Sequence, residues 1–187
     1  MMRHLRQGFL ALLLLLPSIT ACDGTVEHTY TSLHARFRFT PVTAMTPLYT
    51  ALNSPGQFCT IRFDQKTYIF TLSDGTSSTY PRTAIEAYGK PLYITGFLVG
   101  TPAVPDLSGN FYSVAFDLAC PVCYEEAYLE RDVSISASTP NTATCSRCHS
   151  AFDLNNGGIC INKAGAHGLY RYRFNYSPAT DLFMINN

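Results

Sequence analysis

The stretches CPVC at residues 120–123 and CSRCHSAFDL at residues 145–154 determine the expected fold of this chain. Each begins with a Cys-x-x-Cys pair, and 21 residues separate the two pairs. Two thiolates three positions apart in a tight turn can face one centre, and a second such turn completes four-coordination. The spacing therefore predicts two loops that close on one metal centre, with the ligands Cys120, Cys123, Cys145 and Cys148.

Three interpretations of these four cysteines are open at this stage. A single tetrahedral ion, either a structural zinc or a rubredoxin-like iron, matches the spacing of the two loops best. Four thiolates can instead hold a [2Fe-2S] cluster. Two disulfides or a redox dithiol are the third alternative, because the thiols of an exported protein can oxidise.

The composition outside these loops favours strands. Tyr and Phe number 12 each while charged residues make up 14% of the chain, a bias typical of sheets. No long amphipathic helix is expected, only short helical turns at residues 84–88 and 125–129. Turn clusters rich in Gly, Asn and Asp, such as NNGG at residues 155–158, separate apolar or alternating runs. These runs predict strands at residues 37–39, 59–63, 67–72, 92–95, 112–116, 169–174 and 182–185.

From Phe111 to Phe174 the chain resembles a Rieske domain. That family has Cys-x-His in one loop and Cys-x-x-His-Gly-x-x-Phe-Asp-Leu in the next. Here VAFDLACP at residues 114–121 leads into the first loop, and CSRCHSAFDL forms the second. NNGG, AGA at residues 164–166 and GLYRY at residues 168–172 follow. The resemblance implies an all-β domain over residues 31–187, built of stacked antiparallel sheets, with a small two-knuckle metal-binding subdomain at about residues 118–168.

The chain departs from that family at its two histidine ligands. Cys123 stands one residue late, and Cys148 stands at the expected four residues before Phe152, so the ligand set becomes four cysteines. His149 takes the place of the family's glycine and is expected to be a loop residue. Because two imidazoles raise the potential of a Rieske cluster, thiolates in their place would lower it.

The N-terminus has the pattern of a signal peptide. Basic residues that include Arg3 and Arg6 precede the apolar run at residues 9–16, which is too short to span a membrane. The following Ile-Thr-Ala-Cys resembles a bacterial lipobox, which predicts cleavage after residue 21, lipidation of Cys22 and a tether over residues 22–30. We therefore expect a cell-envelope protein, periplasmic or surface-facing, that its lipid holds to a membrane. Two alternatives are an ordinary signal peptide that leaves Cys22 as a spare thiol, and an uncleaved anchor.

The charge of the mature chain excludes a nucleic-acid partner. Of 13 basic side chains Arg3 and Arg6 are lost with the signal, which leaves 11 against 13 acidic ones and a net charge of about −2. No recognisable nucleophile setting or Gly-rich phosphate loop occurs, so we expect no enzyme.

Two functions remain for the expected metal centre. The first is a metal-stabilised structural lipoprotein. The second is an electron carrier that meets an envelope redox partner through the loop tips around Pro121-Val122 and Ser146-Arg147. Two further cysteines, Cys59 and Cys160, lie in apolar surroundings, where they are either small buried side chains or the two ends of a disulfide.

Overall fold

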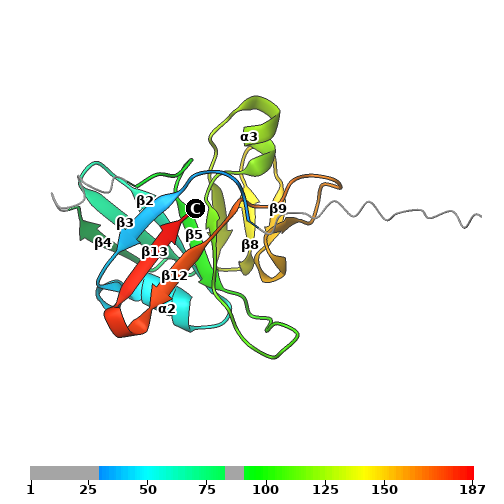
Figure 1. The fold of residues 1–187 in the computed structure, drawn as a ribbon. Helices are drawn as coiled ribbons and strands as arrows, with labels where there is room; N and C mark the ends of the chain where they lie inside the picture. The colour runs from blue at the N-terminus through cyan, green and yellow to red at the C-terminus, as the bar shows by residue number, and fades with distance from the viewer. Residues whose placement is uncertain (1–29, 83–90) are drawn as a thin grey trace, which may run out of the picture.

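The computed structural model describes residues 30–82 and 91–187 (Figure 1). Cys22, the signal segment, tether residues 22–29 and the helical turn expected at residues 84–88 lie outside these described residues. Within them the chain forms 13 strands in three antiparallel sheets, which confirms the predicted β-rich domain. Two short α-helices complete the fold; the one at Pro121–Ala127 overlaps the helical turn expected at residues 125–129, whereas the one at Thr46–Asn53 was not expected.

The elements have the following bounds. The strands are β1 (Arg36–Phe39), β2 (Gln57–Phe63), β3 (Thr67–Leu72), β4 (Ser77–Pro81), β5 (Phe97–Thr101), β6 (Val114–Asp117), β7 (Val133–Ser136), β8 (Thr139–Cys145), β9 (Ala151–Asp153), β10 (Ile159–Cys160), β11 (Arg171–Tyr172), β12 (Phe174–Ser177) and β13 (Leu182–Asn186). The helices are α2 (Thr46–Asn53) and α3 (Pro121–Ala127), with 3-10 turns at Val42–Ala44, Leu154–Asn156 and Pro178–Thr180.

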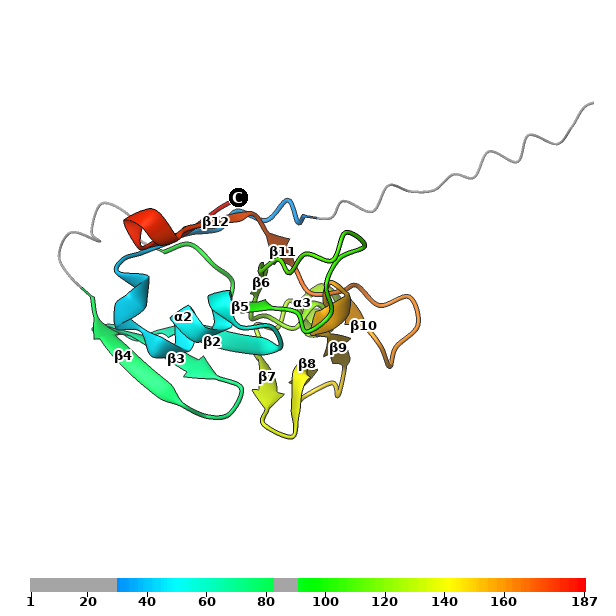
Figure 2. The same ribbon diagram turned by 90° about the horizontal axis from the view of Figure 1, so that it is seen from below.

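The largest sheet has six strands in the order β11-β6-β5-β2-β3-β4. A three-stranded sheet, β1-β13-β12, joins the beginning of the described chain to its end, and a four-stranded sheet, β10-β9-β8-β7, follows α3. Figure 2 shows β7 to β10 gathered on one side of the molecule and α2, β3 and β4 on the other. The two expected cysteine loops belong to the side that carries the four-stranded sheet.

The six-stranded sheet separates two hydrophobic cores. Along β5, Phe97 and Val99 belong to a first core shared with β1, β13 and α2, whereas Leu98 belongs to a second core shared with the four-stranded sheet. In the neighbouring β6, Ala115 faces the first core and Phe116 the second. Because both faces of β5 are covered, Phe97, Leu98 and Val99 are all apolar and the strand shows no alternation.

The structure confirms some of the predicted strands and contradicts others. Residues 67–72 form β3, and the strands expected at 59–63 and 182–185 lie within β2 and β13. The strand expected at residues 92–95 is wrong, since Leu92 makes only an isolated bridge to Arg36 and the strand begins at Phe97. Helix α2 was not expected, although Pro47 stands in its first turn and Leu48, Ala51 and Leu52 are buried. Among the described residues, no helix is both long and apolar enough to cross a membrane.

Candidate metal centre

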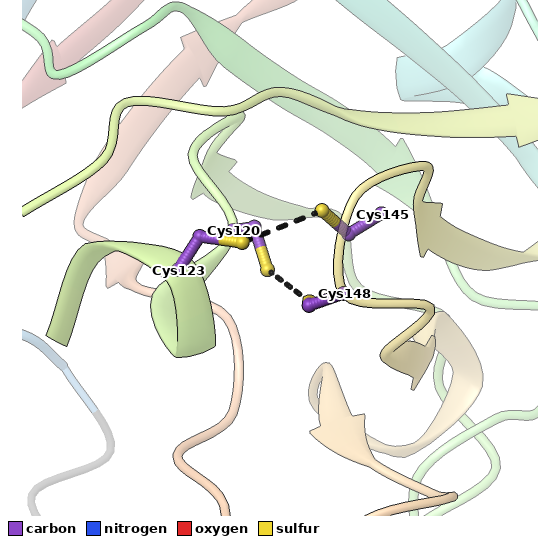
Figure 3. Close-up of side chains that lie close together, drawn as sticks. All are labelled: Cys120, Cys123, Cys145 and Cys148. Carbon is purple, nitrogen blue, oxygen red and sulfur yellow. Dashed lines mark hydrogen bonds between the residues drawn. The ribbon is translucent and has the colours of Figure 1, made fainter. Parts of the chain in front are cut away.

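The four cysteines of the two Cys-x-x-Cys pairs lie together in the structure (Figure 3). Their Sγ atoms all lie within 4.8 Å of one another. The Sγ atoms of Cys120 and Cys148 are 3.5 Å apart, and those of Cys123 and Cys145 are 3.8 Å apart, so both close contacts join one loop to the other. Zinc–sulfur bonds of about 2.3 Å in a tetrahedron place the sulfur atoms about 3.8 Å apart. The group therefore has the dimensions of a single four-thiolate ion site.

The first pair lies at the beginning of α3. Cys120 immediately precedes the helix, and Pro121 occupies its first turn, where the missing N–H of proline costs nothing. The amide of Cys120 donates to the carbonyl of Arg131 at 2.6 Å, and the Cys120 carbonyl accepts from the amide of Tyr124 at 3.1 Å. The helical turn brings Cys123 back beside Cys120, so both sulfur atoms lie at the same end of the helix.

The second pair lies in the turn between β8 and β9. The amide of Cys145 donates to the carbonyl of Ser150, and the amide of His149 donates to the carbonyl of Cys145, each at 3.0 Å. Asn162 braces this turn from outside. Its side chain accepts from the amide of Ala151 at 2.9 Å and donates to the carbonyl of His149 at 2.7 Å. The turn is thus closed by its own backbone and held by one side chain from beyond β10.

Burial and hydrogen bonding set the protonation of the thiols. Cys120, Cys123 and Cys145 are buried within the second core, while Cys148 is half-buried. Burial raises the pKa of Cys120 and raises that of Cys123 to about 11. Burial also acts to raise the pKa of Cys148. Hydrogen bonds to its sulfur, of which those from the Ser150 hydroxyl and amide have the largest effect, outweigh burial and lower this pKa to about 6. A bound cation would offset the cost of burying thiolates here.

The six cysteines that the structure describes are free thiols. A disulfide needs a sulfur–sulfur bond of about 2.05 Å, and the contacts of 3.5 Å and 3.8 Å within the group are far longer. Cys59 and Cys160 are not joined either, because they belong to different parts of the fold. Cys59 is fully buried in the first core on β2, and Cys160 packs against the second core on β10, at the edge of the four-stranded sheet.

Sequence reasoning missed a buried carboxylate at the base of the first loop. Asp117 is fully buried at the end of β6. Its Oδ1 accepts from the amides of Ala119 at 2.7 Å and Thr95 at 3.3 Å, and its Oδ2 from the amide of Ile94 at 2.9 Å and the Tyr172 hydroxyl at 3.0 Å. Burial raises the pKa of this carboxyl group. The sequence signal for this group was a single acid within the apolar run VAFDLA. An acid in a buried strand predicts a carboxylate that accepts several hydrogen bonds, because burial without them is costly.

Two other expectations about the loops have different outcomes. His149 is exposed and lies outside the four-sulfur group, in agreement with its expected place as a loop residue. The first half of the expected docking face is wrong, because Pro121 and Val122 are both buried and Val122 belongs to the second core. Ser146 and Arg147 are exposed beside Cys148, as the second half of that face requires.

Comparison of the chain with models of protein families, with curated proteins and with solved structures found no match in any of the three. The centre is therefore interpreted from the chain's own sequence and from the geometry of its four sulfur atoms.

Proposed function

We propose that the chain is an exported lipoprotein of the bacterial envelope whose Rieske-like domain holds one zinc ion in a structural role. The compact group of four sulfur atoms carries this proposal. In a two-iron cluster, thiolates on different irons lie farther apart than thiolates on one iron, because the bridging sulfides and the second iron stand between them. Four Sγ atoms that all lie within 4.8 Å of one another fit one ion and are too close for that separation.

The surroundings of the sulfur atoms support a structural role. Four protein ligands would leave no open coordination position for water or substrate, which argues against catalysis at this centre. Three of the four cysteines belong to the second core, so the ion would tie α3 to the turn between β8 and β9 from inside that core. Free energy from binding such an ion becomes folding free energy, about 10–16 kcal/mol in zinc-finger peptides at pH 7.

The Rieske-like part of the proposal is supported by one backbone angle. His149 has a φ of 57°, in the left-handed region that favours glycine. This is the position at which the Rieske pattern has its glycine. The three antiparallel sheets are compatible with the same family, and the lipobox-like sequence that ends at Cys22 supports export and lipidation.

An iron-containing electron carrier is the second candidate, because iron accepts the same four thiolates. The observation that favours it is the position of Cys148. This ligand is half-buried next to exposed Ser146 and Arg147, so an electron would have a short route from the metal to a redox partner at this surface.

Metal content and visible absorption separate the two candidates. Residues 23–187, purified without oxygen, are expected to contain about one zinc per chain and no visible chromophore. The Cys145→Ser/Cys148→Ser variant should lose the metal, whereas Cys160→Ser should keep it, because Cys160 lies outside the four-sulfur group. Iron with a band that bleaches on reduction would establish the electron carrier instead, and metal-free wild type would overturn both.

Lipidation is tested separately from the metal. When the full chain is expressed in bacteria with labelled palmitate, we expect the wild type to incorporate label and Cys22→Ser to remain unlabelled. Absence of label from the wild type would overturn the anchor and leave the metal centre unaffected.

A further inference from the structure

A groove beside the first described residues is lined by three cationic side chains and by no acidic one. It has a volume of about 1010 Å³ and lies between the chain at Tyr30, the segment after β10 and β11. Lys163, Arg171 and Arg173 line it, and no Asp or Glu is among the lining residues. Within the described part of the chain, no carboxylate lies within ion-pair distance of these three side chains. The mature chain is slightly acidic as a whole, so the concentration of positive charge is local.

Exposed aromatic rings accompany these cations. The guanidinium of Arg173 lies 4.8 Å from the centre of the Tyr30 ring, and that of Arg171 lies 5.3 Å from the Tyr30 ring and 5.8 Å from the Tyr112 ring. Tyr30 is 36% exposed and Tyr112 is 42% exposed. Phe111, beside Tyr112, is 50% exposed. Contiguous exposed apolar patches, unlike single exposed rings, mark sites of interaction with proteins or membranes.

The apolar and cationic groups extend on the same side of the molecule. Tyr112 is joined to the groove by its contact with Arg171, and Phe111 directly precedes it in the chain. Ile159 of β10 lines the groove and is 47% exposed. We define the basic aromatic face as Tyr30, Phe111, Tyr112, Ile159, Lys163, Arg171 and Arg173.

The described part of the chain begins at this face. Tyr30 lines the groove and is eight residues after Cys22. Even fully extended, eight residues reach at most about 28 Å, at about 3.5 Å per residue. A lipid on Cys22 would therefore keep this face within about 28 Å of the membrane, since Tyr30 lines the groove.

We propose that the basic aromatic face lies on the anionic phospholipid surface of the membrane that holds the anchor. This inference rests on the lipid anchor of the proposed function. Lys163, Arg171 and Arg173 donate hydrogen bonds to lipid phosphates, and the rings of Phe111 and Tyr112 lie at the boundary between headgroups and acyl chains, where amphipathic and apolar side chains are favoured. The anchor makes this contact intramolecular, so modest affinity suffices to orient the domain.

Sedimentation with vesicles tests the face without the anchor. Residues 23–187 are suitable because all three sheets and both cores lie within residues 30–187. We expect binding to phosphatidylcholine vesicles that contain phosphatidylglycerol and much weaker binding to phosphatidylcholine alone. Each Lys or Arg near an anionic surface strengthens partitioning about fivefold, so Lys163→Gln/Arg171→Gln/Arg173→Gln should weaken it about a hundredfold.

A matched variant controls for net charge. Arg38→Gln/Lys66→Gln/Arg131→Gln removes three exposed cations outside the groove and should change partitioning by less than about threefold. Equal losses in the two triple variants, or no binding to anionic vesicles, would overturn the proposal. Binding of free glycerol phosphate without vesicle binding would also overturn it, by assigning the groove to a small anion. Zinc content of the same samples reports on the metal centre independently.

Discussion

His149 marks the point in the second cysteine loop where the backbone requires an unusual conformation. Its φ of 57° costs a residue with a Cβ about 1–2 kcal/mol relative to ordinary helical geometry, and its side chain is exposed. The contacts it makes in the turn are backbone hydrogen bonds with Cys145 and Asn162, which any residue could form. The side chain of His149 is therefore replaceable, whereas its backbone is not.

His149→Gly should retain the metal and raise the free energy of unfolding by up to about 1 kcal/mol. Glycine adopts this φ without strain, although its greater freedom in the unfolded chain offsets part of the gain. Urea unfolding of metal-loaded protein measures the difference. A loss of metal or a large destabilisation would mean that the imidazole takes part in the site.

Asp117→Asn should destabilise the protein by about 1–3 kcal/mol, because each carboxylate oxygen accepts two hydrogen bonds. In either orientation of the asparagine side-chain amide, its NH₂ group would face two hydrogen-bond donors where the carboxylate presented an acceptor. Tyr172→Phe removes one of the four donors and should cost about 1 kcal/mol, which makes it a graded control. If Asp117→Asn unfolded at the wild-type urea concentration, the carboxylate would not hold the base of the first loop.

Individual strands and turns show where the sequence was informative. Residues 67–72 were predicted exactly because one face of β3 is covered and its side chains alternate in burial. β5 was misplaced because both its faces are buried and all five of its residues are apolar or small, so no period identifies it. Helix α2 is only eight residues long, too short for a clear helical repeat. The cysteine loops were predictable because their spacing depends on local turn geometry alone.

The turn at Gly157 and Gly158 provides a paired test of packing. Both glycines have positive φ, 66° and 78°, so alanine is strained at either position. A Cβ on Gly157 meets nothing within 4 Å, whereas one on Gly158 lies 3.0 Å from Leu169 and 3.1 Å from Phe116 in the second core. Gly157→Ala should cost about 1 kcal/mol. Gly158→Ala should cost about 1–3 kcal/mol more, measured by urea unfolding. Equal costs would show that the second core is loosely packed at this turn.

The arrangement of the protein as a whole could not be predicted from local patterns. The three-stranded sheet pairs β1 with β13, and the groove brings Tyr30 against Arg171, residues that are far apart in the sequence. Such pairings depend on which apolar faces meet, and the thirteen short strands of the described residues allow many arrangements. In contrast, the four-cysteine site required only that two local turns face each other across the second core.

Removal of the proposed metal should affect the second core far more than the first. The four-stranded sheet and α3 enclose the cysteines, whereas α2, β1 and β13 pack around a separate core. Chelator should therefore accelerate hydrogen exchange first in residues 118–168, with little change in β3 or α2. Uniform acceleration over the whole chain would indicate that the metal stabilises both cores together.

Acid should release the metal, since protons compete with it for the thiolates. Burial raises the pKa of Cys120 and Cys123, so both hold protons at neutral pH without metal and must lose them on binding. Zinc affinity should accordingly increase as pH rises from 6 to 8, with release of at least these two protons per zinc. Calorimetry in buffers of different ionisation enthalpy measures the number. Affinity that does not change with pH would contradict thiolate ligation.

X-ray absorption at the metal edge tests the four-sulfur centre most directly. For metal-loaded residues 23–187 we predict a single shell of four sulfur atoms at about 2.3 Å from one zinc, with no neighbouring metal atom. The Cys145→Ser/Cys148→Ser variant should lose this shell. A spectrum with a metal–metal distance, or with fewer than four sulfur ligands in the wild type, would contradict the single-ion centre.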